Sequence, residues 1–260
     1  MLKVLAIGNS YSQDAIAYLH DLAHSSGIEV LAANLFNSGC PLQRHWEHVL
    51  GNSSQYLYEL NGKGTGEMIS IEAALAREKW DYVTFQQASR DSGLLDSYYP
   101  YIKNLSDYVT KHAPAAEQLI HQTWAYELDN TEEGFGIYHH NQAEMHRALT
   151  EAYKAAAKSL GLRLIPSGQV IQELRRTPAF DYANGGPSLQ RDGSHLSLSY
   201  GRYAVAGTWY ECIAKGNILE NTYIPPSESG MIDMAKIDTI KRCIHDVVKR
   251  SSKGVMLTEI

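Results

Sequence analysis

Short apolar runs alternate with longer amphipathic segments along most of the chain. Runs rich in Val, Ile, Leu, Ala and Phe predict buried strands at residues 3–7, 29–36, 81–87, 118–123 and 162–165. Apolar residues at helical spacing predict helices at residues 13–25, 43–50, 67–80, 98–112, 140–160, 166–176, 197–215 and 232–249. Such alternation is typical of a parallel sheet with helices on both faces. We therefore predict an α/β fold, a three-layer α/β/α sandwich of the flavodoxin-like kind, with about five parallel strands in the order 2-1-3-4-5.

Nothing in this pattern suggests a boundary between domains, and we expect a single domain over residues 1–260. Residues 51–66 are rich in Gly, Asn, Ser and Tyr, which predicts an insertion or a small hairpin. Residues 178–194 form a long segment without periodicity. Because a compact domain seldom holds so long a loop without a use for it, we expect this loop to be functional.

Composition narrows the class of protein further. Hydrophobic residues make up 44% of the 260 positions and the net charge is −6, with no basic cluster, so no nucleic-acid partner is expected. The three cysteines form no Cys-x-x-Cys pair, which predicts neither a disulfide framework nor a zinc site. No apolar run approaches the roughly 20 residues of a membrane span, so we expect no membrane partner. The first residues lack the pattern of a signal peptide, which favours a cytoplasmic location.

Ser10 is the first candidate for chemistry. It follows the first predicted strand in the polar turn Gly8-Asn9-Ser10-Tyr11-Ser12, before a helix begins. In open α/β sheets, ligands bind at the carboxyl ends of the strands. Ser10 is therefore expected at such an edge, where it could act as a nucleophile.

The second candidate lies near the other end of the chain, in Asp192-Gly193-Ser194-His195. A serine hydroxyl needs a base to take its proton, and the base needs an acid to orient it. In a tight turn, Asp192 reaches the imidazole Nδ1 of His195 while Nε2 points outward. The alternative is that Asp192 only shapes the turn and His195 is a surface residue.

Together these segments resemble the SGNH (GDSL-like) hydrolase superfamily, in which a Gly-Asp-Ser turn carries the nucleophile and Asp-x-x-His lies near the C-terminus. The resemblance implies a triad of Ser10, Asp192 and His195. Asn9 replaces the usual Asp here. A loop Gly after strand two would donate its N–H to the oxyanion, and Gly39 fits that place.

The block after strand three departs most from the family pattern. Residues 85–91 read Phe-Gln-Gln-Ala-Ser-Arg-Asp, which is similar to the His-Gln-Gly-Glu-Ser-Asn/Asp pattern of sialate and xylan O-acetylesterases. Matching the two implies that Gln87 completes an oxyanion hole with Ser10 and Gly39. The alternative is that Gln86 or Gln87 bonds backbone groups at the end of the strand.

Other polar and aromatic residues are candidates to line a pocket or to bind a metal. Four residues at predicted strand ends are candidates to line the pocket: Asn9, Gln86, Trp124 and Tyr126. His139, His140, Glu144 and His146 share one predicted helix, but an exposed polar face explains them as well. We expect no metal and no cofactor.

The sequence thus predicts a serine esterase that works through an acyl-enzyme. Its expected partner is a small-molecule or oligosaccharide ester, and O-acetyl groups on a carbohydrate are the favoured substrate. The alternatives are a lipase or thioesterase for longer acyl chains, a non-catalytic carbohydrate-binding relative, and an anion or nucleotide binder that uses the turn at residues 9–12. The sequence predicts no oligomeric state.

Overall fold

In the computed structural model, the described part of the chain, residues 1–228 and 230–252, forms one seven-stranded sheet in the order β4-β3-β2-β1-β5-β6-β7. Its strands are β1 (Leu2–Gly8), β2 (Val30–Phe36), β3 (Tyr56–Leu60), β4 (Lys63–Ile69), β5 (Tyr82–Phe85), β6 (Glu117–His121) and β7 (Arg163–Ile165). Five of these strands are mutually parallel and lie side by side in the order β2-β1-β5-β6-β7. This is the predicted order 2-1-3-4-5. The sheet as a whole is larger and mixed.

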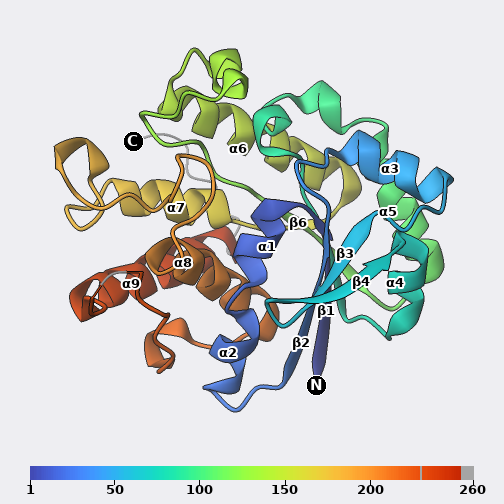
Figure 1. Cartoon of the computed structure of the whole chain (residues 1–260), viewed down its shortest axis with the longest axis horizontal. Coiled ribbons are helices and arrows are strands. Elements are labelled where there is room, and N and C mark those ends of the chain that lie inside the picture. Colours follow the sequence, from blue (N-terminus) through green and yellow to red (C-terminus); the bar gives the residue numbers. More distant parts are fainter. Residues whose placement is uncertain (229, 253–260) are drawn as a thin grey trace.

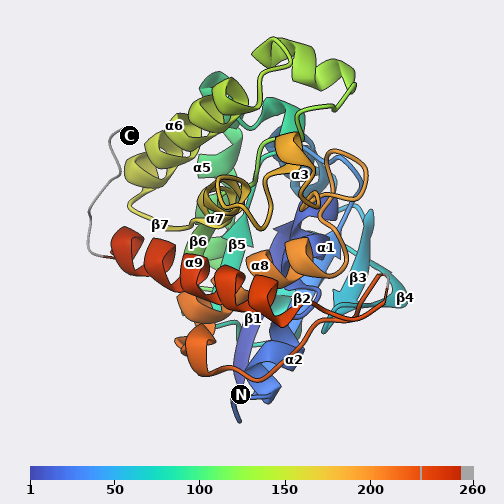
Figure 2. The same cartoon turned by 90° about the vertical axis from the view of Figure 1, so that its left-hand side faces the viewer.

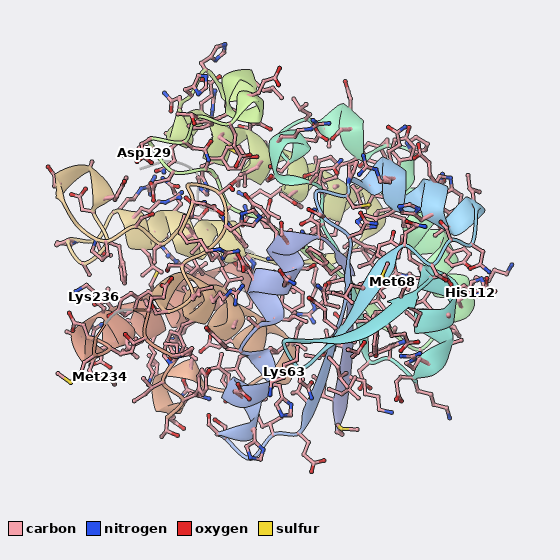
Figure 3. The ribbon with its side chains drawn as sticks, in the orientation of Figure 1. Lys63, Met68, His112, Asp129, Met234 and Lys236 are labelled. Carbon is pink, nitrogen blue, oxygen red and sulfur yellow. The ribbon has the colours of Figure 1, made fainter. Side chains whose placement is uncertain are left out.

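The two additional strands form an antiparallel hairpin, in which β3 pairs with both β2 and β4. It accounts for the predicted insertion at residues 51–66, but the predicted helix at residues 67–80 began too early. Most of the outer strand is exposed, and Figure 3 shows Lys63 and Met68 along it. The helix α4 begins only at Ile71, because the Ser70 hydroxyl caps it by accepting the Ala73 N–H.

The helices sandwich this sheet. They are α1 (Ser10–Ile16), α2 (Leu19–His24), α3 (Leu42–Leu50), α4 (Ile71–Arg77), α5 (Tyr101–His112), α6 (Gln142–Leu160), α7 (Ser167–Arg175), α8 (Tyr200–Trp209) and α9 (Met234–Ser252). Figures 1 and 2 show α1, α2, α7, α8 and α9 gathered on one face, and α3, α4 and α5 on the other, with α6 near the β7 edge. For the helices that connect parallel strands, this division follows from right-handed crossovers, since the strand order runs in opposite directions on either side of β1.

The central strand β1 explains why the apolar runs are continuous. Val4, Leu5, Ala6 and Ile7 are all essentially inaccessible to solvent. Helices cover both faces of a parallel strand, so every side chain along it is buried. The first helix predicted at residues 13–25 is in fact two helices, which separate at Ala17 and Tyr18. Its start is earlier than predicted, at Ser10 itself.

Candidate active site

Ser10 is the first residue of α1, directly beyond the carboxyl end of β1. The Asn9 side chain ends the strand and caps the helix, because its Oδ1 accepts the Tyr11 N–H at 3.0 Å. Only glycine fits at position 8, because a Cβ there would lie 2.3 Å from the Ser12 Oγ. The Gly8-Asn9-Ser10 turn therefore places the Ser10 hydroxyl, half-buried, at the helix N-terminus.

The loop between α7 and α8 passes beside α1 (Figure 1), and its residue His195 reaches this serine. The Ser10 Oγ lies 2.8 Å from the His195 Nε2, and the His195 Nδ1 lies 2.8 Å from the Asp192 Oδ2. The structure thus brings the three predicted triad residues into one hydrogen-bonded chain, although 185 positions separate Ser10 and His195. This is the nucleophile, base and orienting acid arrangement of serine hydrolases.

Local hydrogen bonds fix the position of the Asp192 carboxylate. Its Oδ1 accepts the backbone N–H groups of Ser194 at 3.0 Å and His195 at 2.7 Å. Partial burial disfavours the charged carboxylate, but these backbone bonds and the contact with the imidazole outweigh it and lower the pKa of Asp192 to about 2. Asp192 is therefore ionised at neutral pH and accepts the Nδ1–H of His195. Nε2 is then free to accept the proton of Ser10.

A second layer of side chains supports the turn from beneath. The Ser194 carbonyl accepts the Trp124 indole N–H at 2.9 Å and the Gln190 amide at 3.0 Å. Trp124 also stacks on Tyr11, with ring centroids 4.4 Å apart. Trp124 and Tyr126, predicted to line the pocket, are both buried and cannot do so. They lie under the site because the Ser194 carbonyl needs a buried donor and the Tyr126 hydroxyl bonds Ser89.

Asn9 and Gln86, also predicted as pocket residues, are likewise buried and form a polar link across the strand ends. The Gln86 Nε2 donates to the Asn9 Oδ1 at 2.7 Å, and the His121 Nδ1 lies 3.0 Å from the Gln86 Oε1. Burial lowers the pKa of His121 to about 3, so its ring is neutral and donates through Nδ1. This link ties the ends of β1, β5 and β6 together below Ser10.

Two backbone N–H groups are available for an oxyanion. Ser10 is the first helical residue, so its N–H has no carbonyl partner within α1. The Gly39 loop lies beside it, because the Asn9 Nδ2 donates to the Cys40 carbonyl at 3.2 Å. Gly39 has a φ of +59°, and nothing lies within 4 Å of where a Cβ would be. The left-handed backbone thus favours glycine, and space above it remains open to a ligand.

Gln87 does not lie as the family pattern implied. Its Nε2 donates to the backbone oxygen of Ser97 at 3.0 Å and to the Ser97 Oγ at 2.9 Å. Its Oε1 accepts the N–H groups of Leu42 at 3.0 Å and Ala88 at 2.8 Å, which also fixes the orientation of the amide. Both amide hydrogens are therefore engaged, and none is left for an oxyanion. The reading in which Gln87 bonds backbone groups describes it better.

A pocket of about 260 Å³ opens on the outer side of the Asp192 turn. Its wall is polar and comprises Glu127, Asp129, Asn130, Thr131, Tyr182, Ser188, Gln190, Arg191, Asp192 and Gly193. Figure 3 shows Asp129 in the loop after β6. Glu127 is buried and lies 3.8 Å from the guanidinium of Arg175, which is also buried. Neither residue stands out in the sequence, because positions 127 and 175 meet only in the folded chain.

Within residues 1–228 and 230–252, no group of three or more His, Cys, Asp or Glu side chains is arranged so that it could hold a metal ion. Of the four helix residues considered, His139 contacts Glu144 at 3.0 Å, and His139 is exposed. Over the same residues, no helix combines the length and the apolar character that crossing a bilayer requires.

Comparison with known proteins sets this geometry in context. A family model described as "Domain of unknown function (DUF4886)" matches residues 3–241. The chain belongs to the DUF4886 family. A crystal structure of a DUF4886 family protein from Bacteroides uniformis ATCC 8492 is 37% identical, with a TM-score of 0.88, over 100% of this chain and 98% of that one. No significant match was found among curated proteins.

More distant structures share the fold of this DUF4886 chain. A putative SGNH hydrolase from Slackia heliotrinireducens is 23% identical, with a TM-score of 0.53, over 81% of this chain and 97% of that one. An acetylxylan esterase from Geobacillus stearothermophilus is 13% identical, with a TM-score of 0.51, over 82% and 94%. The fold is therefore SGNH-like, as the motifs implied, with a mostly parallel seven-stranded sheet.

Proposed function

We propose that this DUF4886 protein is a serine hydrolase that cleaves small carboxylic esters. The observation that carries the proposal is the continuous chain from the Ser10 Oγ through His195 to Asp192, with both links at 2.8 Å. A surface histidine beside a turn-forming aspartate would have no reason to contact a half-buried hydroxyl at a helix N-terminus. A binder of anions would use the N–H groups at residues 9–12, and the hydrogen-bonded series Ser10–His195–Asp192 would then have no function.

The proposed reaction uses this hydrogen-bonded arrangement. His195 takes the Ser10 proton at Nε2 while the Ser10 Oγ attacks the ester carbonyl carbon. The Ser10 and Gly39 N–H groups stabilise the resulting oxyanion. The tetrahedral intermediate collapses as His195 returns the proton to the departing alkoxide, which leaves as the alcohol. Water, deprotonated by His195, then attacks the acyl-Ser10 carbonyl, and the acid is released as Ser10 regains its proton.

We infer that the polar pocket takes the alcohol part of the substrate, because Asp192 both lines it and is hydrogen-bonded to His195, and that a hydroxyl-rich alcohol suits it better than a long acyl chain. Carboxylate, amide and phenol groups line it, and these are hydrogen-bond partners for hydroxyl groups. An aliphatic chain would desolvate these polar groups without giving them hydrogen-bond partners, which costs free energy. We therefore propose an O-acylated carbohydrate, with acetyl as the acyl group. The likeness in fold to an acetylxylan esterase is consistent with this substrate.

A fluorophosphonate probe tests the chemistry, because it labels only activated serines. We expect labelling of the wild type and none of Ser10→Ala, with the labelled peptide containing Ser10. An unlabelled wild type would overturn the esterase proposal.

The substrate is tested separately by comparing p-nitrophenyl acetate with p-nitrophenyl octanoate, and by measuring acetate release from acetylated xylooligosaccharides. A higher kcat/KM for octanoate would favour a lipase or thioesterase instead.

A further inference from the structure

The buried carboxylate of Asp14 has no role in the proposed reaction. Asp14 lies on α1, four residues after Ser10, and its side chain is fully buried. A carboxylate so deeply buried is costly unless charged partners and hydrogen bonds surround it. Its partners therefore indicate what the charge is for.

Those partners come from the loop that carries the base. The Asp14 Oδ2 accepts the Leu196 N–H at 2.8 Å, and the Arg191 Nη1 lies 3.1 Å from both carboxylate oxygens. Arg191 and Leu196 are the residues that flank the Asp192–His195 turn. The Arg191 N–H also donates to the His195 carbonyl at 2.9 Å, so the two sides of the turn are joined at its base.

The two contacts between α1 and this loop run side by side. Residues four apart on a helix share one face, roughly 6 Å from each other. On the loop, His195 and Leu196 are neighbours. Hence Ser10 meets His195, and one helical turn further on Asp14 meets Leu196.

We propose that Asp14 is a positioning residue that sets the distance between the Ser10 Oγ and the His195 Nε2. This inference rests on the proposed function. Asp14 does not touch the reacting atoms and does not itself line the pocket, although its partner Arg191 does. It acts by clamping the base of the Asp192–His195 turn to the helix that carries the nucleophile, and Figure 1 shows α1 beside the loop before α8.

A third partner of Asp14 provides a matched control. Arg202 on α8 donates through Nε to the Asp14 Oδ1 at 2.8 Å, and its Nη2 lies 2.7 Å from the same oxygen. Arg191 and Arg202 each supply one guanidinium to the same carboxylate. Only Arg191 belongs to the loop that carries His195.

The main variant is Asp14→Asn. Every group that faces the carboxylate is a donor, so the amide NH₂ of an asparagine must oppose one of them, and at least one contact is lost. A displacement of about 1 Å can cost about 100-fold in rate. With p-nitrophenyl acetate we expect kcat to fall 10- to 100-fold while KM stays within about twofold. In a crystal structure of the variant, the distance from the Ser10 Oγ to the His195 Nε2 should exceed 3.5 Å.

The arginine pair keeps the test decisive if Asp14→Asn does not fold. We expect Arg191→Gln to lower kcat at least fivefold, and any contribution of Arg191 to the pocket would appear in KM. Arg202→Gln should lower the Tm but leave kcat within about twofold. Equal kcat values for these two variants would overturn the proposal, as would a folded Asp14→Asn that keeps a distance near 2.8 Å.

Failure of the proposed function is distinguishable from failure of this inference. If fluorophosphonate does not label the wild type, the esterase proposal fails, whereas the distances in the variant crystal structures still test whether Asp14 positions His195.

Discussion

Asp192→Asn is the substitution that most directly tests how the triad works. Asparagine can keep the bonds that its Oδ1 accepts from the Ser194 and His195 backbones, so the turn should retain its shape. Its Nδ2, however, would face the His195 Nδ1. Because an NH₂ group needs an acceptor, the imidazole would carry its proton on Nε2 and point it at Ser10. The base would then be in the wrong tautomer to accept the Ser10 proton.

The size of the effect follows from the role of the acid and from its exposure. Loss of the correct tautomer in a serine triad costs about 10⁴-fold in kcat. The Asp192 side chain is 47% exposed, so water can replace part of its interaction with the imidazolium. We therefore expect kcat to fall by about 10²- to 10⁴-fold, which corresponds to about 3–5 kcal/mol of transition-state stabilisation. KM should change little.

The assay is steady-state hydrolysis of p-nitrophenyl acetate, together with the rate of fluorophosphonate labelling. Asp107→Asn is the control, because Asp107 lies on α5 and bonds the exposed Lys103 side chain rather than the imidazole. We expect it to leave kcat within about threefold. If Asp192→Asn retained kcat within tenfold of the wild type, Asp192 would not orient His195 and the reasoning would be refuted.

Three further predictions concern stability and the strand ends. Gln87→Ala leaves the buried N–H groups of Leu42 and Ala88 without their acceptor. We therefore expect the free energy of unfolding, measured with urea, to fall by about 1–3 kcal/mol. Its kcat should stay within about threefold, and a large fall in kcat without a loss of stability would restore Gln87 to the oxyanion hole. Asn9→Asp cannot donate to the Cys40 carbonyl, so we expect a lower kcat through displacement of the Gly39 loop, and a kcat equal to that of the wild type would contradict this. The pKa of Asp192 is lowered from 3.8 to about 2, so its contribution to stability should be complete above about pH 4 and disappear as the pH falls through about 2. Urea unfolding of the wild type and Asp192→Asn should therefore converge at low pH, and a constant difference would refute the assignment.

The sequence was sufficient to predict the parallel core because its strands are apolar on both faces. Runs such as residues 4–7 are buried whichever way a side chain points, so every position in them is apolar. The β3–β4 hairpin was harder to predict, since its outer strand is exposed and contains Gly64 and Gly66. Such residues do not produce the alternation that marks a strand.

The residues of the candidate site could likewise be predicted only in part. Ser10, Asp192 and His195 were identifiable because each belongs to a short local motif. Gln87 was misassigned because its partners, Leu42 and Ser97, come from segments that no spacing along the chain connects to it. Asp14 carried a detectable signal, a charged residue four positions after the nucleophile, but its meaning depends on where Leu196 lies.

The separation of 185 positions between Ser10 and His195 also bears on how the protein is made. Synthesis proceeds from the N-terminus, so the serine emerges first and its base emerges only after β7 and α7. If Ser10 is the nucleophile as proposed, the nascent chain holds an unactivated hydroxyl until the loop before α8 docks on α1, and it cannot acylate itself on esters. Hydrolytic activity would thus report that the last third of the chain has joined the first helix, and a fragment ending before residue 195 would remain silent however well its sheet had formed.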